Sequence, residues 1–129
     1  MSNKELVKTA CTAAFINRDM SAVDKYWSVD YIQHNPQVGS GLEGLKKLLS
    51  YLPKEFKYEM GLVLGDGEFV MFHSRATGWG PKPLIVVDLF RVKDGKITEH
   101  WDVMQEEVAA ENTASKNPMF PILQTAGAV

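Results

Sequence analysis

Two carboxylates and an imidazole occur close together in one predicted β-hairpin. Asp88 precedes a turn at residues 93–95, and His100 and Asp102 follow it. A carboxylate on an apolar wall loses solvation, and a second carboxylate nearby disfavours ionisation further, so one of the two can exchange protons near neutral pH. Such a base, with a hydrogen-bond donor beside it, could remove a proton next to a carbonyl group and stabilise the enolate. The predicted chemistry is therefore general acid and base catalysis.

The hairpin that carries these groups spans residues 84–105, with the turn sequence Lys-Asp-Gly. Such a turn favours a three-residue loop closed by glycine in the left-handed conformation. This loop predicts Val92 opposite Lys96 and Asp88 opposite His100. One face then carries Val86, Asp88, Phe90, Val92, Thr98, His100, Asp102 and Met104. The other carries Val87, Leu89, Arg91, Ile97, Glu99, Trp101 and Val103. Because the first face mixes charged with apolar groups, we expect it to line a pocket.

A second hairpin is predicted over residues 57–77, with its turn at Asp66-Gly67. Alternation along the second strand puts His73 and Arg75 on one face with Phe69, Met71 and Thr77. We expect His73 and Arg75 to face the pocket. Asp102 is the predicted base, and the predicted donors to the developing enolate oxygen are Asp88 when protonated, His73, Arg75 and Asn35.

Further residues are predicted to contact a substrate. They are His34, Asn35, His100, Trp27, Tyr31, Phe90 and Met104. A simpler alternative remains open, in which Asp88 and Arg75 form a buried ion pair and His100 satisfies Asp88, so that the set only holds the hairpin in register. The aromatic residues could equally be ordinary core, and a histidine before Asn-Pro is typical of a turn or strand end.

Composition narrows the class of protein. The chain has 129 residues and a net charge of -2, which fits one domain over residues 1–129 and argues against nucleic acid as a partner. No apolar run resembles a signal peptide or a membrane span, so a cytoplasmic location is expected. Cys11 is the single cysteine, which excludes an internal disulfide. The histidines and carboxylates follow no metal-ligand spacing, so neither a metal nor another cofactor is expected.

The order of elements predicts an α+β fold. A capping box of Ser2 and Glu5 starts a helix over residues 3–17, and Ser21 is expected to cap a short second helix that ends near Trp27. An extended segment over 31–36 and a third helix over 42–52 follow. Three N-terminal helices should pack on a curved antiparallel sheet. The tail from about residue 107 should be tied down by Met119 and Phe120.

Two stretches resemble a known family. They are Tyr31-Ile-Gln-His-Asn-Pro36 with Gly41-Leu-Glu-Gly44, and Val87 to Val92 with Asp94-Gly-Lys-Ile97 and Glu99-His-Trp-Asp102. Both are similar to the SnoaL-like polyketide cyclase group of the nuclear transport factor 2-like superfamily. The resemblance implies a cone-shaped α+β barrel that encloses a pocket, commonly as a homodimer. This fold hosts cyclases, isomerases, dehydratases, epoxide hydrolases and binding proteins.

The resemblance also implies roles for single residues. Asp102 matches the general acid/base aspartate of the polyketide cyclases, and Asp88 falls where they carry a supporting pocket residue, usually histidine. Against ketosteroid isomerases, Asp88 matches the oxyanion-hole acid, but Asn35 replaces the base and Cys11 the tyrosine, which argues against steroid isomerisation. Asp88, Arg75, Asp102 and Asn35 could imitate the Asp-Arg-Asp set of limonene-epoxide-hydrolase-like proteins.

The sequence therefore predicts an acid/base enzyme of cyclase or isomerase type that acts on a small, hydrophobic carbonyl or polyketide-like compound. A homodimer through the outer sheet face is expected, with neither nucleic acid nor membrane as a partner. The alternatives are a small-molecule binding protein without turnover, an epoxide-hydrolase-like enzyme, and a dimeric interaction module whose sheet is the assembly surface.

Overall fold

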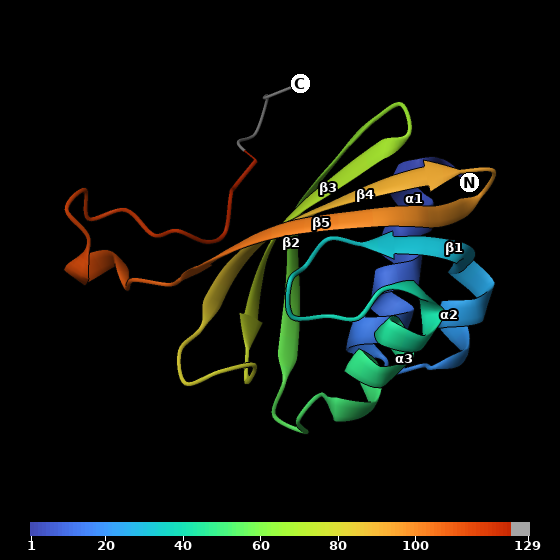
Figure 1. Cartoon of the computed structure of the whole chain (residues 1–129). Coiled ribbons are helices and arrows are strands. Elements are labelled where there is room, and N and C mark those ends of the chain that lie inside the picture. The colour runs from blue at the N-terminus through green and yellow to red at the C-terminus, as the bar shows by residue number, and fades with distance from the viewer. Residues whose placement is uncertain (125–129) are drawn as a thin grey trace.

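Helices on one side of a strongly curved sheet form the body of the molecule (Figure 1). The computed structural model describes residues 1–124. Its helices are α1 (Asn3–Cys11), α2 (Ser21–Tyr26) and α3 (Gly41–Tyr51), with a π-helical turn at Thr12–Ile16 and a 3-10 turn at Ala110–Asn112. Its strands are β1 (Trp27–Gln33), β2 (Lys57–Asp66), β3 (Phe69–Thr77), β4 (Leu84–Lys93) and β5 (Lys96–Glu106). Within the described residues, none of the helices is long and apolar enough to cross a membrane.

The first two helices follow local signals in the sequence. The Ser2 hydroxyl accepts a hydrogen bond from the Glu5 backbone N–H at 3.1 Å, which caps α1 as expected. The predicted cap at Ser21 is wrong, because Ser21 lies inside α2 and its N–H donates to the Asp19 carboxylate at 3.0 Å. Asp19 therefore satisfies the first turn of α2 from outside the helix.

The sheet has the order β1-β5-β4-β3-β2, and it is mixed. The neighbours β2, β3, β4 and β5 pair in antiparallel fashion, as expected from the two hairpins. Strand β1 joins the edge parallel to β5, with Gln33 aligned with His100. This long-range pairing brings the end of β1 next to the residues that carry the predicted chemistry.

The hairpin of β4 and β5 differs from its predicted register. The turn has two residues, Asp94 and Gly95, both with positive φ, so Lys93 faces Lys96. A bulge then leaves Thr98 without an opposite residue on β4, because Val92 pairs with Ile97 whereas Arg91 pairs with Glu99.

This bulge changes which residues share a face. Asp88 stands opposite Asp102, and Phe90 stands opposite His100, so the predicted pairing of Asp88 with His100 is wrong. Ile97 was expected on the outer face but is fully buried in the core. The residues 100, 102 and 104 still face inward, since the extra residue restores their parity.

Strand β3 alternates strictly between a buried and a partly exposed face. Val70, Phe72, Ser74 and Ala76 are buried between the sheet and the helices. His73 and Arg75 lie on the opposite face, so the prediction that they face the pocket is wrong. The alternation itself was predicted, but the choice of the inward face was not, because a strand with apolar residues on both sides gives no clear sign of its core face.

The tail turns back toward the outer face of the sheet. The Met119 sulfur accepts a hydrogen bond from the Val108 N–H at 3.3 Å, and the Phe120 ring stacks on His73 at 5.8 Å between centroids. The anchoring by these two residues was expected from the sequence. Because His73 is on the outer face, Phe120 packs on the side of the sheet away from the helices.

Gly44 allows the loop after β1 to touch helix α3. A Cβ atom at this position would lie 1.8 Å from the Gly39 carbonyl oxygen. The helix backbone and the loop therefore approach as closely as they do only because residue 44 has no side chain.

We predict that Gly44→Ala destabilises the protein by about 1–3 kcal/mol, because the loop must move away from the helix. In a helix without this contact the same change would stabilise by about 1 kcal/mol. Urea unfolding measures the difference. Gly80→Ala is the control, since nothing lies within 4 Å of a Cβ there, and a stabilised Gly44→Ala variant would contradict the prediction.

Candidate functional site

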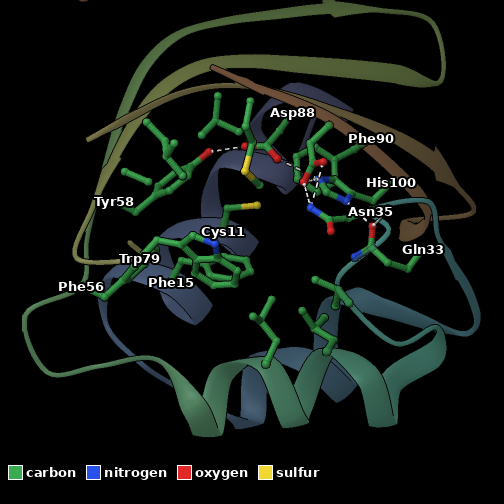
Figure 2. A pocket seen from close by; sticks show the side chains of 18 of the residues that line it. Cys11, Phe15, Gln33, Asn35, Phe56, Tyr58, Trp79, Asp88, Phe90 and His100 are labelled. Carbon is green, nitrogen blue, oxygen red and sulfur yellow. Dashed lines mark hydrogen bonds and ion pairs between the residues drawn. The ribbon is translucent and has the colours of Figure 1, made fainter. Parts of the chain in front are cut away.

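A cavity of about 90 Å³ lies between the inner face of the sheet and the helices. Figure 2 shows side chains from all sides pointing toward this space. Most of the lining is apolar or aromatic, and the polar groups are few. The apolar lining comprises Cys11, Phe15, Trp27, Val38, Leu45, Leu48, Phe56, Ala76, Trp79, Leu84, Val86, Phe90 and Met104, and the polar lining comprises Tyr31, Gln33, Asn35, Tyr58, Asp88, His100 and Asp102. This combination is typical of sites for small organic molecules.

Asp88 is held by hydrogen-bond partners on two other strands, β5 and β2 (Figure 2). Its Oδ1 lies 2.8 Å from His100 Nε2, and its Oδ2 accepts from the Tyr58 hydroxyl at 2.7 Å. Both Asp88 and His100 are 7% exposed. Burying a charged carboxylate is costly unless it is paired, so these two contacts explain how Asp88 is tolerated at the cavity wall.

Asp102 is held by the loop that follows β1. The Asn35 amide nitrogen donates to both of its carboxylate oxygens, at 2.9 and 2.8 Å. The side-chain oxygen of Asn35, Oδ1, accepts a hydrogen bond from the Gln37 backbone N–H at 2.8 Å. This contact fixes the orientation of the side-chain amide, with its NH2 group toward Asp102. His100 Nε2 lies 3.9 Å from the nearer oxygen of Asp102. The Nε2 atom of the imidazole therefore lies near both carboxylates.

The environment shifts the protonation of this set in a useful direction. Burial raises the pKa of the Asp102 carboxyl above its ordinary value, and the charge of Asp88 raises it further, while the hydrogen bonds from Asn35 and the nearby His100 lower it. Burial also raises the pKa of the Tyr58 phenol well above its ordinary value, with Asp88 adding to the effect. Tyr58 therefore keeps its proton, and the Asp102 carboxyl, whose pKa is raised, loses its proton at a higher pH than an ordinary aspartate does.

Cys11 lies on the same wall but in an unreactive state. Burial raises the pKa of its thiol well above the ordinary value, and Asp88 raises it further. The thiolate is the nucleophilic form of cysteine, so this side chain behaves as a small apolar group.

Most of the predicted site residues line the cavity. Those that do are Asp88, Asp102, His100, Asn35, Trp27, Tyr31, Phe90 and Met104. They come from β1, the loop after it, β4 and β5, which are brought together by the order of strands in the sheet.

Three predicted residues lie elsewhere. His34 is on the outer side, where its ring stacks on Trp101 at 4.8 Å and its Nε2 pairs with Glu99 at 2.7 Å. Arg75 pairs with Glu59 and Glu107 at 3.1 and 2.7 Å. The predicted Asp88–Arg75 pair is therefore wrong, as is an Asp-Arg-Asp set, since Arg75 does not line the cavity and its partners are glutamates. His73 contacts Phe120 instead of the cavity.

Two polar residues of the site were missed. Tyr58 lies on β2 and reaches Asp88 across the sheet, and Gln33 contacts His100 from the last position of β1. Tyr58 stands in an alternating strand, and Gln33 lies two residues before Asn35, so parity along each strand was the available signal. Parity alone did not place Tyr58 and Gln33 in the site, because the strands that pair with β1 and β2 could not be identified from the sequence.

Asp88, His100 and Asp102 are also the one group in residues 1–124 whose donor atoms could surround a metal ion, as these atoms lie within 4.8 Å of one another. The pairing of β4 with β5 brings these three residues together, and their spacing in the sequence matches no metal-ligand motif. Its donor atoms are engaged, since Asp88 contacts His100 and Tyr58, and Asp102 accepts twice from Asn35. Hydrogen bonds within the protein thus account for the cluster.

Comparison with known families identifies the domain. Residues 8–100 match the model of the SnoaL-like domain. The chain belongs to this family. The resemblance seen in the sequence motifs is thereby confirmed. Among curated proteins, none matches the sequence.

Solved structures agree with this SnoaL-like fold. A candidate ketosteroid isomerase from Kribbella flavida has a TM-score of 0.72 and 16% identity, over 96% of this chain and 91% of its own. A candidate polyketide cyclase from Bacillus cereus has a TM-score of 0.64 and 23% identity, over 74% of this chain and 69% of its own. An LEH-like epoxide hydrolase from Mycobacterium tuberculosis has a TM-score of 0.63 and 23% identity, over 80% of this chain and 82% of its own. At these identities the likeness shows a shared fold, and the predicted α+β class is confirmed.

The raised pKa of Asp102 predicts a pH-dependent effect on stability. A carboxyl with a higher pKa in the folded state binds more protons folded than unfolded, so its contribution to stability falls as pH rises. We therefore compare the free energies of unfolding of the parent protein and of Asp102→Asn. The parent's value minus the variant's should decrease as the pH rises from the ordinary pKa of 3.8 to the raised pKa of Asp102. Urea unfolding across this range measures it. Exposed Asp30→Asn controls for the loss of one charge, and a difference that rises with pH would contradict the assignment.

Proposed function

We propose that this SnoaL-like protein is an acid/base enzyme of cyclase or isomerase type acting on a small, largely apolar carbonyl or polyketide-like compound. The observation that carries the proposal is Asp102, a partly buried carboxyl with a raised pKa that lines the cavity beside a histidine–carboxylate pair. General bases work best when their pKa lies near the operating pH, and burial moves Asp102 in that direction.

In the proposed reaction, the Asp102 carboxylate removes a proton from the carbon next to the carbonyl group. The proton shared by His100 and Asp88 is then available to the developing enolate oxygen. His100 Nε2 and Asp102 Oδ2 are 3.9 Å apart, so base and acid can reach neighbouring atoms of one small molecule. Asp102 then gives its proton either back to carbon, as in an isomerisation, or to the alkoxide that forms when the enol carbon attacks a second carbonyl group. In both cases the enol proton goes back to the His100–Asp88 pair as the new carbonyl bond forms, and the site is restored.

The cavity lining supports an apolar substrate without a negative charge. Among residues 1–124, no lysine or arginine lines the cavity, and its ionisable groups at this wall are two aspartates beside one histidine. A carboxylate or phosphate ligand would face the aspartates without a cation to pair with. Aromatic side chains such as Phe15, Trp27 and Trp79 offer flat apolar surface instead.

A binding protein without turnover is the second candidate. It is favoured by the hydrogen bonds of the polar groups, because Asp88, Asp102 and Asn35 all have partners within the protein. Such a satisfied network could simply stabilise the cavity wall. The third candidate, an interaction module, is disfavoured by the cavity at Asp88 and Asp102, which a pure assembly domain has no need to keep open.

The first two candidates separate in one experiment. Thermal shift and native mass spectrometry against cyclic ketones, polyketide intermediates, epoxides and steroids should give a ligand, since binding at a hundredfold excess over Kd stabilises by roughly 2.7 kcal/mol. With that ligand as substrate, Asp102→Asn should lower turnover by roughly 10²–10⁴-fold and leave binding intact.

Asp30→Asn, an exposed carboxyl outside the cavity, should turn over as the parent does. Ligand binding with no turnover in the parent protein would favour the binding protein. Turnover that survives Asp102→Asn would show that Asp102 is not the base.

We further propose that the protein forms a homodimer through the outer face of the sheet. On that face Val103 of β5 is 72% exposed and stands opposite Val87 on β4, so this apolar pair offers contact surface to the same pair of a second copy. Native mass spectrometry should show a dimer for the parent and a monomer for Val103→Lys. A monomeric parent protein would contradict this proposal.

A further inference from the structure

Gln33 is a polar residue of the cavity lining to which the proposed reaction assigns no role. It is the last residue of β1, and it stands beside His100 in the parallel pairing with β5. Its side-chain oxygen lies 2.6 Å from His100 Nδ1. The contact is on the opposite ring nitrogen from Asp88, which contacts Nε2.

The surroundings determine which end of the Gln33 amide faces the imidazole. The backbone N–H groups of His34 and Asn35 donate to Oε1 at 3.1 and 3.0 Å, and Nε2 donates to the Tyr31 hydroxyl at 3.1 Å. A flipped amide would point its NH2 at two backbone donors and lose both bonds. The atom that faces His100 is therefore an amide oxygen.

An amide oxygen accepts hydrogen bonds and has no proton to give. Nδ1 of His100 must therefore carry the proton in this contact. The second ring nitrogen, Nε2, is left to exchange a proton with Asp88 at 2.8 Å. On its far side Asp88 accepts from Tyr58, whose raised pKa keeps that phenol protonated.

We propose that Gln33 is a positioning residue that holds the proton of His100 on Nδ1 and so confines proton exchange to the Nε2–Asp88 pair. One proton then lies between Nε2 and Oδ1, on the side of the ring that also approaches Asp102. If Nδ1 lost its proton, the ring would hold its single proton on Nε2 as a fixed donor to Asp88, and no proton could move between them.

In catalysis this role rests on the proposed function. Asp102 gains a proton from carbon, and the His100–Asp88 pair gives its proton to the oxygen, so the total number of protons in the site does not change. The tautomer itself is independent of turnover. It would hold equally in a binding protein, so its failure and the failure of the enzyme proposal are distinguishable.

Nitrogen-15 NMR of the histidine rings tests the tautomer directly. The chain has three histidines, and the double variant His34→Gln with His73→Gln leaves only His100, while removing no residue of the cavity lining. In this background we expect Nδ1 to give a protonated, pyrrole-like signal with a slowly exchanging hydrogen. A bare, pyridine-like Nδ1 would overturn the proposal without any further variant.

Two substitutions then assign the effect to Gln33. Gln33→Met keeps the length of the side chain but removes the acceptor, so the Nδ1 proton should be lost and Nε2 should become the protonated nitrogen. Gln33→Glu keeps an oxygen acceptor for His100 and for both backbone N–H groups, so it should retain the protonated Nδ1.

A purely structural role for Gln33 predicts a different result. In that case Gln33→Met would lower stability through the unpaired Asn35 N–H group, while the His34 N–H keeps the His100 carbonyl oxygen as a partner, and it would leave the Nδ1 signal unchanged. An unchanged signal in Gln33→Met would overturn the proposal, as would its loss in Gln33→Glu. If Gln33→Met does not fold, the parent spectrum and Gln33→Glu still decide.

Discussion

Three ionisable side chains at the edge of an apolar cavity set the main constraint on this structure. Asp88, His100 and Asp102 are close together and largely withdrawn from water, which is unfavourable unless each finds hydrogen-bond partners. None of the partners that satisfy the two aspartates from outside the hairpin is a neighbour in sequence. Tyr58 comes from β2, and Asn35 comes from the loop after β1. The sheet order, with β1 added next to β5, is what makes these partners available.

The same constraint explains why the end of β1 is so densely bonded. Within residues 33–37, side chains contact the His100 ring, the Asp102 carboxylate and the backbone of the turn itself. The loop is held on its other side by the close approach of Gly39 to Gly44 in α3. The loop after β1 thus connects helix α3 to the part of the cavity that contains Asp102, and it holds the side chains of the site in position without a ligand.

Local patterns in the sequence predicted a large part of this fold. Capping at Ser2, turn residues at both hairpins and alternation along β3 and β4 are properties of neighbouring residues, and each gave the right type of element. The residues on the inner face of β4 and β5 that carry the site were also predicted. Two local details failed, the cap at Ser21 and the length of the turn between β4 and β5, and so did relations between distant elements. The inward face of β3 depends on where the helices pack, and the contacts of Gln33 depend on the parallel pairing of β1, which no local signal specifies. Arg75 found its partners in Glu59 and Glu107 for the same reason.

The bulge at Thr98 has a consequence for reading related sequences. In a regular ladder continued from the turn, the inward residues of β5 beyond Ile97 would be Glu99, Trp101 and Val103, and both His100 and Asp102 would point to the outer face. One inserted residue therefore decides on which side of the sheet the acid lies. In a homologue of different hairpin length, an aspartate aligned with Asp102 keeps its place in the cavity only if the number of residues between turn and acid changes by an even number, or if a bulge is gained or lost in compensation. An odd-length insertion or deletion without a compensating bulge would move the aligned aspartate to the outer face of the sheet.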